Sequence, residues 1–121
     1  MSQHMQHTDL MRTRLTRLFE AAVAAARAEN CLPQHLPPAE TNGRILLLAA
    51  GKAAGAMTAV AERVYLDEHG LSPDRLTGLC VTRHGYARPT RHIPVIEAGH
   101  PVPDSAGVEG TAKCLEIAAG A

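Results

Sequence analysis

The sequence is poor in aromatic residues, with one Phe, two Tyr and no Trp. A core must therefore be built from Ala, Leu, Val and Ile, and the aromatic platforms that stack nucleic-acid bases are excluded. The chain also lacks an excess of either charge, because twelve acidic and twelve basic residues give a formal net charge of zero. No electrostatic attraction to nucleic acid or to an anionic membrane is expected.

Cysteine is scarce and long apolar runs are absent. Cys31, Cys80 and Cys114 stand far apart without a CxxC pair, which predicts reduced thiols and a cytoplasmic protein. The polar N-terminus has no apolar run of the signal-peptide type, and the apolar stretches elsewhere are too short to span a membrane. Hydrophobic residues make up 45% of the 121 positions, which is typical of one folded domain.

Apolar spacing predicts helices over residues 8–30 and 52–69, and a last helix that Asp104 or Ser105 caps and that runs through Ala118. The first eight residues are expected to form a frayed tail. Strands are expected over 45–50, 78–82 and 93–98. The continuous apolar run Ile45–Ala50 is typical of a parallel strand that is buried on both faces.

This order of elements predicts an α/β fold, a mostly parallel sheet with flanking helices. Three strands make a thin sheet with exposed edges, and the chain stops directly after a helix that would normally lead to another strand. We therefore expect residues 1–121 to be part of a larger domain.

Three polar segments follow the three expected strands, where ligands of open parallel sheets bind. They are Gly51-Lys52, the run from Thr82 to Gly85, and Gly99-His100-Pro101. The first opens a helix, whose free N–H groups favour an anion, and Lys52 adds a positive charge suited to a carboxylate or a transferring phosphoryl group. The spacing of neither a Walker A loop nor a dinucleotide fingerprint is present.

An alternative interpretation stays open for this segment: Gly51 and Gly55 serve tight strand–helix packing, and Lys52 is a solvated residue at the helix start. For the segment that contains Thr82 and Arg83, the residues alone favour a polar surface loop over an anion-binding role. His84, His92 and His100 have no Cys, Asp or Glu at ligand spacing, so no metal site is predicted from the residues.

Three stretches resemble one known family: LLLAAGKAAGAM ending at Met57, GLCVTRHGY at 78–86 and VIEAGHPVPD at 95–104. They are similar to the N-terminal domain of the glycerate 2-kinases, whose C-terminal half is the MOFRL domain and some of which are named hydroxypyruvate reductase. The resemblance covers the chain from about Leu10 to its end. It implies a Rossmann-like N-terminal domain that faces the MOFRL domain, absent here, across a cleft.

The resemblance also implies the reaction, in which ATP phosphorylates D-glycerate to 2-phosphoglycerate with Mg²⁺ as the usual metal. The family's active-site lysine matches Lys52, which is the expected catalytic residue. The motifs alone match five further residues to substrate or phosphate binding, namely Gly51, Thr82, Arg83, His100 and Asp104. Without the second domain we expect this chain by itself to have little or no kinase activity, and association with the C-terminal half or with a second copy is left open.

Two other functions remain as alternatives. A hydroxypyruvate reductase using NAD(P)H would fit the family's older name, although the first strand–turn–helix lacks the Gly-x-Gly-x-x-Gly fingerprint. A non-catalytic α/β module that binds a small anion would share the Gly51-Lys52 segment. Neither composition nor motif decides between such a module and half of an enzyme.

Overall fold

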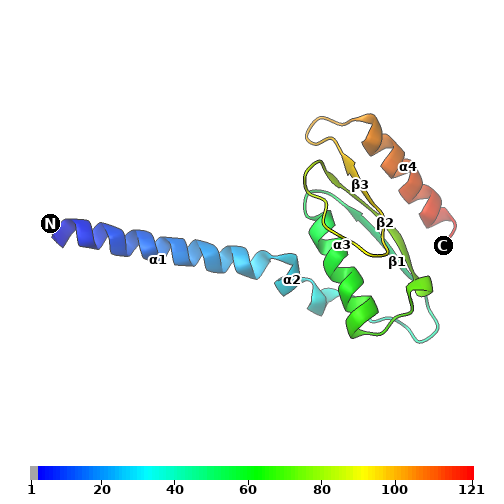
Figure 1. The fold of residues 1–121 in the computed structure, drawn as a ribbon, viewed down its shortest axis with the longest axis horizontal. Helices are drawn as coiled ribbons and strands as arrows, with labels where there is room; N and C mark the ends of the chain where they lie inside the picture. Colours follow the sequence, from blue (N-terminus) through cyan, green and yellow to red (C-terminus); the bar gives the residue numbers. More distant parts are fainter. Residues whose placement is uncertain (1–2) are drawn as a thin grey trace.

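A computed structural model describes residues 3–121, and it contains a three-stranded parallel sheet in the order β1-β2-β3 (Figure 1). The strands are β1 (Ile45–Ala50), β2 (Leu76–Arg83) and β3 (Val95–Ala98). Ile45 pairs with Leu76, and Cys80 pairs with Val95. The predicted parallel α/β fold is confirmed. The third strand begins two residues later than expected, because Pro94 has no N–H to donate to a sheet ladder.

Two helices cover opposite faces of this sheet (Figure 1). Helix α3 (Ala54–Arg63) continues into a π-helical turn, η2 (Val64–Glu68), and packs on β1 and β2. The segment ends as predicted at Gly70, whose φ of 65° suits a glycine after a helix. Helix α4 (Ser105–Ala119) packs on β2 and β3 from the other side. A Cβ on Gly110 would lie 2.9 Å from Val81, so α4 approaches the sheet closely at that point.

The principal core lies between the sheet and α3. Its buried residues are Ala61, Tyr65, Leu71, Leu76 and Ile93. The Tyr65 hydroxyl donates to the carbonyl of Pro37 at 2.8 Å, which ties the segment before β1 to this core. That segment contains the 3-10 turn η1 (Pro33–His35), and a second such turn, η3 (Pro73–Arg75), precedes β2. Cys80 is also buried, and burial raises the pKa of its thiol.

The N-terminal helix differs from its prediction. Helix α1 runs over Gln3–Ala26, so it begins within the segment that was expected to be a frayed tail and not at residue 8. Residues 1 and 2 of the expected frayed tail lie outside the described residues. The chain breaks at Arg27, which is extended, and α2 (Ala28–Cys31) follows, so the expected helix over 8–30 is two helices. The Asn30 amide donates to the Ala24 carbonyl near the end of α1.

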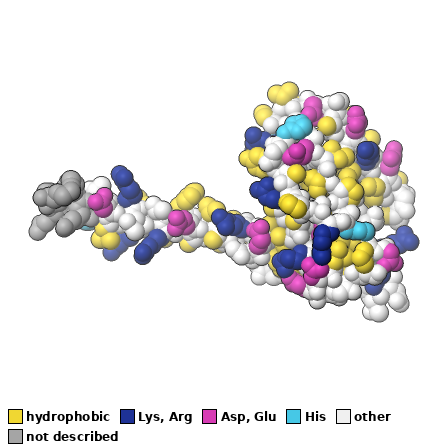
Figure 2. All heavy atoms as spheres, in the orientation of Figure 1, with side chains coloured by type: hydrophobic (Ala, Val, Ile, Leu, Met, Phe, Trp, Pro, Cys, Tyr) yellow, Lys and Arg dark blue, Asp and Glu magenta, His cyan; other side chains and the backbone are white. Residues whose placement is uncertain are grey.

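Helix α1 projects away from the sheet, and hydrophobic side chains are visible along it (Figures 1 and 2). Its exposed apolar residues are Leu10, Met11, Leu15, Leu18, Phe19 and Val23. Within residues 3–121, no helix is both long enough and apolar enough to cross a membrane.

The prediction that Ile45–Ala50 is buried on both faces is wrong. Leu48 is 41% exposed and Ala50 is also exposed, whereas Leu47 on the α3 side packs against the core. The reason is the position of α4, which packs on β2 and β3 and leaves its side of β1 open. Strand β1 is also an edge of the described sheet, as expected for a thin sheet.

The long connection from β2 to β3 crosses the α3 side of the sheet and is fastened there by a buried carboxylate. Glu62 on α3 is 2% exposed and accepts hydrogen bonds from the backbone N–H groups of Arg91 and His92. The Arg91 guanidinium also donates to both carboxylate oxygens of Asp67 at 2.8 and 2.9 Å. These bonds fix the connection without a crossover helix.

Candidate anion-binding site

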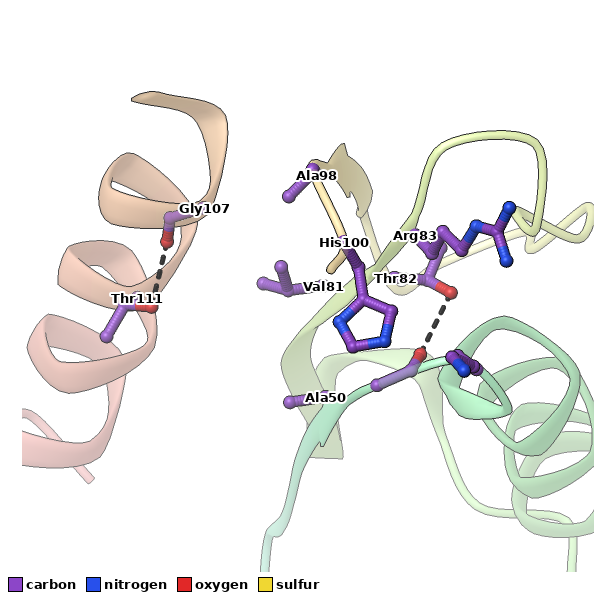
Figure 3. Close-up of a pocket in the computed structure, with 11 residues that line it drawn as sticks. Ala50, Val81, Thr82, Arg83, Ala98, His100, Gly107 and Thr111 are labelled. Atoms are coloured by element: carbon purple, nitrogen blue, oxygen red, sulfur yellow. Dashed lines mark hydrogen bonds between the residues drawn. The ribbon is translucent and has the colours of Figure 1, made fainter. Parts of the chain in front are cut away.

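The three segments that follow the strands meet around one cavity of about 220 Å³, at the carboxyl ends of the strands. Figure 3 shows how its lining residues lie. Six of the residues singled out from the sequence line it, namely Gly51, Lys52, Thr82, Arg83, Gly99 and His100. Sequence reasoning missed the opposite wall, where Gly107 and Thr111 of α4 face the strand ends.

Gly51 forms the sharp turn from β1 into α3. Its φ is 115°, which disfavours any residue with a side chain, although a Cβ there would meet no atom within 4 Å. The Gly51 carbonyl accepts hydrogen bonds from the Ala54 N–H at 3.1 Å and from the buried Thr82 hydroxyl at 3.0 Å. Thr82 therefore fixes the Gly51 turn, and a contact of its own with substrate stays a prediction.

Helix α3 starts beside the cavity without a side-chain cap. Ala53 occupies the N-cap position and makes no capping hydrogen bond through its side chain. The backbone N–H groups of a first helical turn carry partial positive charge and attract anions. Lys52, which is exposed and lines the cavity, adds a full charge at the same end.

Gly55 has a different role from Gly51. A Cβ at Gly55 would lie 2.5 Å from the Tyr86 carbonyl oxygen and 3.3 Å from the Arg88 nitrogen. The packing interpretation therefore holds for Gly55, but its neighbour is the β2–β3 connection and not a strand.

Arg83 ends β2 and begins a tight turn. The Tyr86 N–H donates to the Arg83 carbonyl at 3.0 Å, and Gly85 has a φ of 78°, as the third residue of a type II turn requires. The Arg83 guanidinium lies over the Tyr86 ring, 4.7 Å from its centre, in a cation–π contact. In Figure 3 this guanidinium points away from the His100 ring. Arg83 thus lies at the rim of the cavity.

The carboxylate of Glu97, on β3, binds the backbone of this turn. One carboxylate oxygen of Glu97 accepts hydrogen bonds from the N–H groups of Gly85 at 2.7 Å and Ala87 at 3.2 Å. The Ala87 and Gly85 donors hold the pKa of the Glu97 carboxyl below its usual range. Sequence reasoning passed over Glu97, although a single carboxylate between Ile96 and Ala98 in an apolar strand is a signal that it has hydrogen-bond donors.

Asp104 does not line the cavity. It is the N-cap of α4, as the sequence predicts, and its side chain accepts a hydrogen bond from the Gly107 N–H at 3.0 Å. Its other oxygen lies 2.9 Å from Nε2 of His84. The Gly99 N–H donor, His84 and the Gly107 donor together lower the pKa of Asp104 to about 2. Because the carboxylate is ionised, His84 must donate the proton in this contact.

Asp104 thereby joins the two turns that carry Arg83 and His100. His84 follows Arg83 directly, and Gly99 precedes His100, whose peptide bond to Pro101 is cis. A Cβ at Gly99 would lie 2.4 Å from the Val102 carbonyl, so this second turn is closed tightly on itself. A role for Asp104 in binding substrate stays a prediction.

The chemistry of the cavity favours an anion. Its lining residues include Lys52 and His100, with Arg83 at the rim, whereas neither Glu97 nor Asp104 lines it. The part of the chain that the structure describes contains no group of three or more His, Cys, Asp or Glu side chains able to hold a metal ion. A phosphate or carboxylate fits these residues, whereas the cavity lining offers Mg²⁺ no carboxylate ligand.

The sequence around this cavity matches a known family model over residues 14–121, described as a domain of unknown function (DUF4147). The chain belongs to the DUF4147 family. A protein of Agrobacterium vitis, provisionally named a hydroxypyruvate reductase, is 36% identical over 106 residues, which cover 88% of this chain and 23% of that protein. Pyrococcus horikoshii has a glycerate 2-kinase that is 36% identical over 78 residues, or 64% of this chain and 16% of that enzyme.

A solved member of the fold has the same architecture. The crystal structure of a glycerate kinase from Thermotoga maritima superposes with a TM-score of 0.67 and 25% identity. The match covers 90% of this DUF4147 chain and 25% of the kinase. The chain thus spans about a quarter or less of the length of the relatives that it matches.

Proposed function

We propose that this DUF4147 chain forms the anion-binding wall of a glycerate 2-kinase, which transfers a phosphoryl group from ATP to D-glycerate. The observation that carries the proposal is the cavity at the strand ends, which Lys52, Arg83 and His100 line and beside which α3 begins without a side-chain cap. Relatives named glycerate 2-kinase and glycerate kinase support the choice of reaction.

Phosphoryl transfer depends mainly on positioning and on stabilising the charge that spreads over the transferring group. When bound, ATP would supply that group. Lys52 and the first N–H groups of α3 would bind its negative charge, and Lys52 would stabilise that charge in the transition state. His100 and Arg83 would orient an anionic group, such as the glycerate carboxylate. We derive no step through Mg²⁺, since no carboxylate lines the cavity to hold it.

The test is a chimera in which this chain replaces the matching N-terminal quarter of the Thermotoga maritima glycerate kinase. ADP release is measured with and without D-glycerate in a coupled assay. We expect glycerate-dependent turnover in the chimera and little or none in the 121-residue chain alone, because the other wall of the cleft is supplied by the rest of the kinase. Turnover by the chain alone would contradict this division, and a folded but inactive chimera would contradict the kinase assignment.

Within the chimera, Lys52→Ala should lower kcat by roughly a hundredfold or more, because a charge contact made in the transition state is lost. Lys113→Ala, on α4 and outside the cavity lining, is the matched control and should leave kcat near the unsubstituted value. Equal rates for the two variants would show that Lys52 is only a residue of the helix start.

Hydroxypyruvate reduction is the second candidate, because the Agrobacterium vitis relative is named for it. The turn from β1 into α3 reads Gly51-Lys52-Ala53-Ala54-Gly55, without the three-glycine fingerprint that lets a dinucleotide pyrophosphate approach a strand–helix turn. The same chimera, assayed for NADH oxidation with hydroxypyruvate, should show no reductase activity. A non-catalytic anion-binding module would bind phosphate and fail in both assays.

The proposal includes location and assembly. The three cysteines of the described chain are unpaired, which supports a reducing, cytoplasmic location. The exposed apolar side chains of α1 and the open side of β1 support association with a further part of the kinase fold or with a second copy.

A further inference from the structure

The turn that carries Arg83 is held by carboxylates from two different segments. Glu97 binds the backbone of the turn through the N–H groups of Gly85 and Ala87, and Asp104 binds the His84 side chain. The turn itself is exposed, and its other tertiary hydrogen bond runs from the His84 N–H to the Ala98 carbonyl of β3 at 3.1 Å, so the residues after His84 are held to β3 through Glu97.

Glu97 acts on the cavity through a short chain of contacts. Its two donors, Gly85 and Ala87, flank Tyr86 in the sequence, so the carboxylate fixes the backbone on both sides of that residue. The Arg83 guanidinium lies over the Tyr86 ring, with its central carbon 4.7 Å from the ring centre. The side chain of Glu97 is only partly buried, and it does not line the cavity itself.

We propose that Glu97 is a positioning residue of the anion site, which fixes the Arg83–Tyr86 turn so that the Arg83 guanidinium stays at the rim of the cavity. The inference rests on the proposed function, and it goes beyond it by assigning a role to an acidic side chain of the VIEAGHPVPD stretch that the sequence analysis left without one. Charge-assisted hydrogen bonds from backbone N–H groups are strong enough to hold a surface turn in one position.

The effect of neutralising Glu97 on anion affinity distinguishes a positioning role from a direct effect of its charge. A negative charge near an anion site repels the anion, so neutralising Glu97 should strengthen anion binding if only its charge matters. If Glu97 instead positions Arg83, the same substitution should weaken binding, because a glutamine oxygen accepts weaker hydrogen bonds than a carboxylate and the turn loosens. The two explanations therefore predict effects of opposite sign.

The experiment is a titration of the ¹⁵N-labelled chain with inorganic phosphate at constant ionic strength, followed through the backbone amides of Gly51 and Lys52. Wild type is compared with Glu97→Gln and with Glu109→Gln, which removes the same charge from an exposed position on α4. We expect the Kd to rise roughly threefold to tenfold in Glu97→Gln and to stay equal or fall slightly in Glu109→Gln.

A Kd for Glu97→Gln that equals or falls below the wild-type value would overturn the inference, as would the absence of saturable phosphate binding to wild type. If Glu97→Gln does not give a folded spectrum, Tyr86→Leu tests the same chain of contacts without changing any charge. It should also weaken binding, and an unchanged Kd would overturn the inference. Failure of the kinase proposal is read separately, as the absence of glycerate-dependent ADP release from the chimera.

Discussion

Gly55 lies in the first turn of α3, directly beneath the connection from β2 to β3. Replacing it by alanine adds one methyl group at a point where the nearest atom is a backbone oxygen, that of Tyr86, at 2.5 Å. Two more backbone atoms, in Ala87 and Arg88, would lie at 3.4 and 3.3 Å. Because all three belong to the main chain, no side-chain rotation can make room. Either α3 or the connection has to move.

The magnitude follows from two opposing contributions. Overpacking of this kind costs about 1–3 kcal/mol of unfolding free energy. Alanine in place of glycine within a helix recovers about 1 kcal/mol. The 2.5 Å approach to a main-chain oxygen places the overpacking cost in the upper part of that range, at about 2–3 kcal/mol. We therefore expect Gly55→Ala to destabilise the chain by a net of about 1–2 kcal/mol and to shift the Tyr86 region.

The matched control is Gly107→Ala in the first turn of α4. A Cβ there would meet its nearest neighbours, in Ala98 and Asp104, at 3.7 Å, which is ordinary van der Waals contact. Gly107→Ala should be neutral or should stabilise by up to about 1 kcal/mol. Urea unfolding followed by circular dichroism measures both variants. If Gly55→Ala proved as stable as wild type while the control behaved as expected, the close approach of α3 to the connection would be refuted.

Three further predictions concern single polar groups. Tyr65→Phe removes the hydrogen bond to the Pro37 carbonyl and should lower the unfolding free energy in urea by about 0.5–1.5 kcal/mol; no change would mean that water replaces this bond. Glu62→Gln weakens the buried acceptor of the N–H groups at 91 and 92 and should cost about 1–3 kcal/mol, with faster amide hydrogen exchange confined to the β2–β3 connection. The Asp104 carboxyl has a pKa of about 2 when folded, against about 3.9 in an unfolded chain, so its contribution is present above about pH 4 and is lost as the pH falls toward 2. The stability difference between wild type and Asp104→Asn should therefore shrink between pH 5 and pH 2, and a constant difference would contradict the assignment.

Much of the fold was predictable from local patterns in the sequence. The run Ile45–Ala50 followed by Gly51 identifies a strand that ends in a sharp turn, and the parallel arrangement follows from alternating it with helices. The location of the cavity was predictable for the same reason, because the carboxyl ends of parallel strands lie at one edge of the sheet. Asp104 as the cap of α4 was equally local, since a cap is recognised within one helical turn.

Other features depend on contacts between segments that are distant in the sequence. Whether β1 is covered on both faces depends on where α4 packs, and no pattern within Ile45–Ala50 contains that information. The helix break at Arg27 was missed because apolar spacing continues across it.

The sequence by itself determined which residues stand at the strand ends and what charge they bring, since strand, turn and helix signals are encoded by neighbours along the chain. Only the tertiary structure decided how those residues are held. Glu97 binds N–H groups ten and twelve positions away, and Asp104 binds His84 twenty positions away. Such pairings form only when the folded sheet brings the turns together, because a carboxylate selects its donors by position in space and not by spacing along the chain.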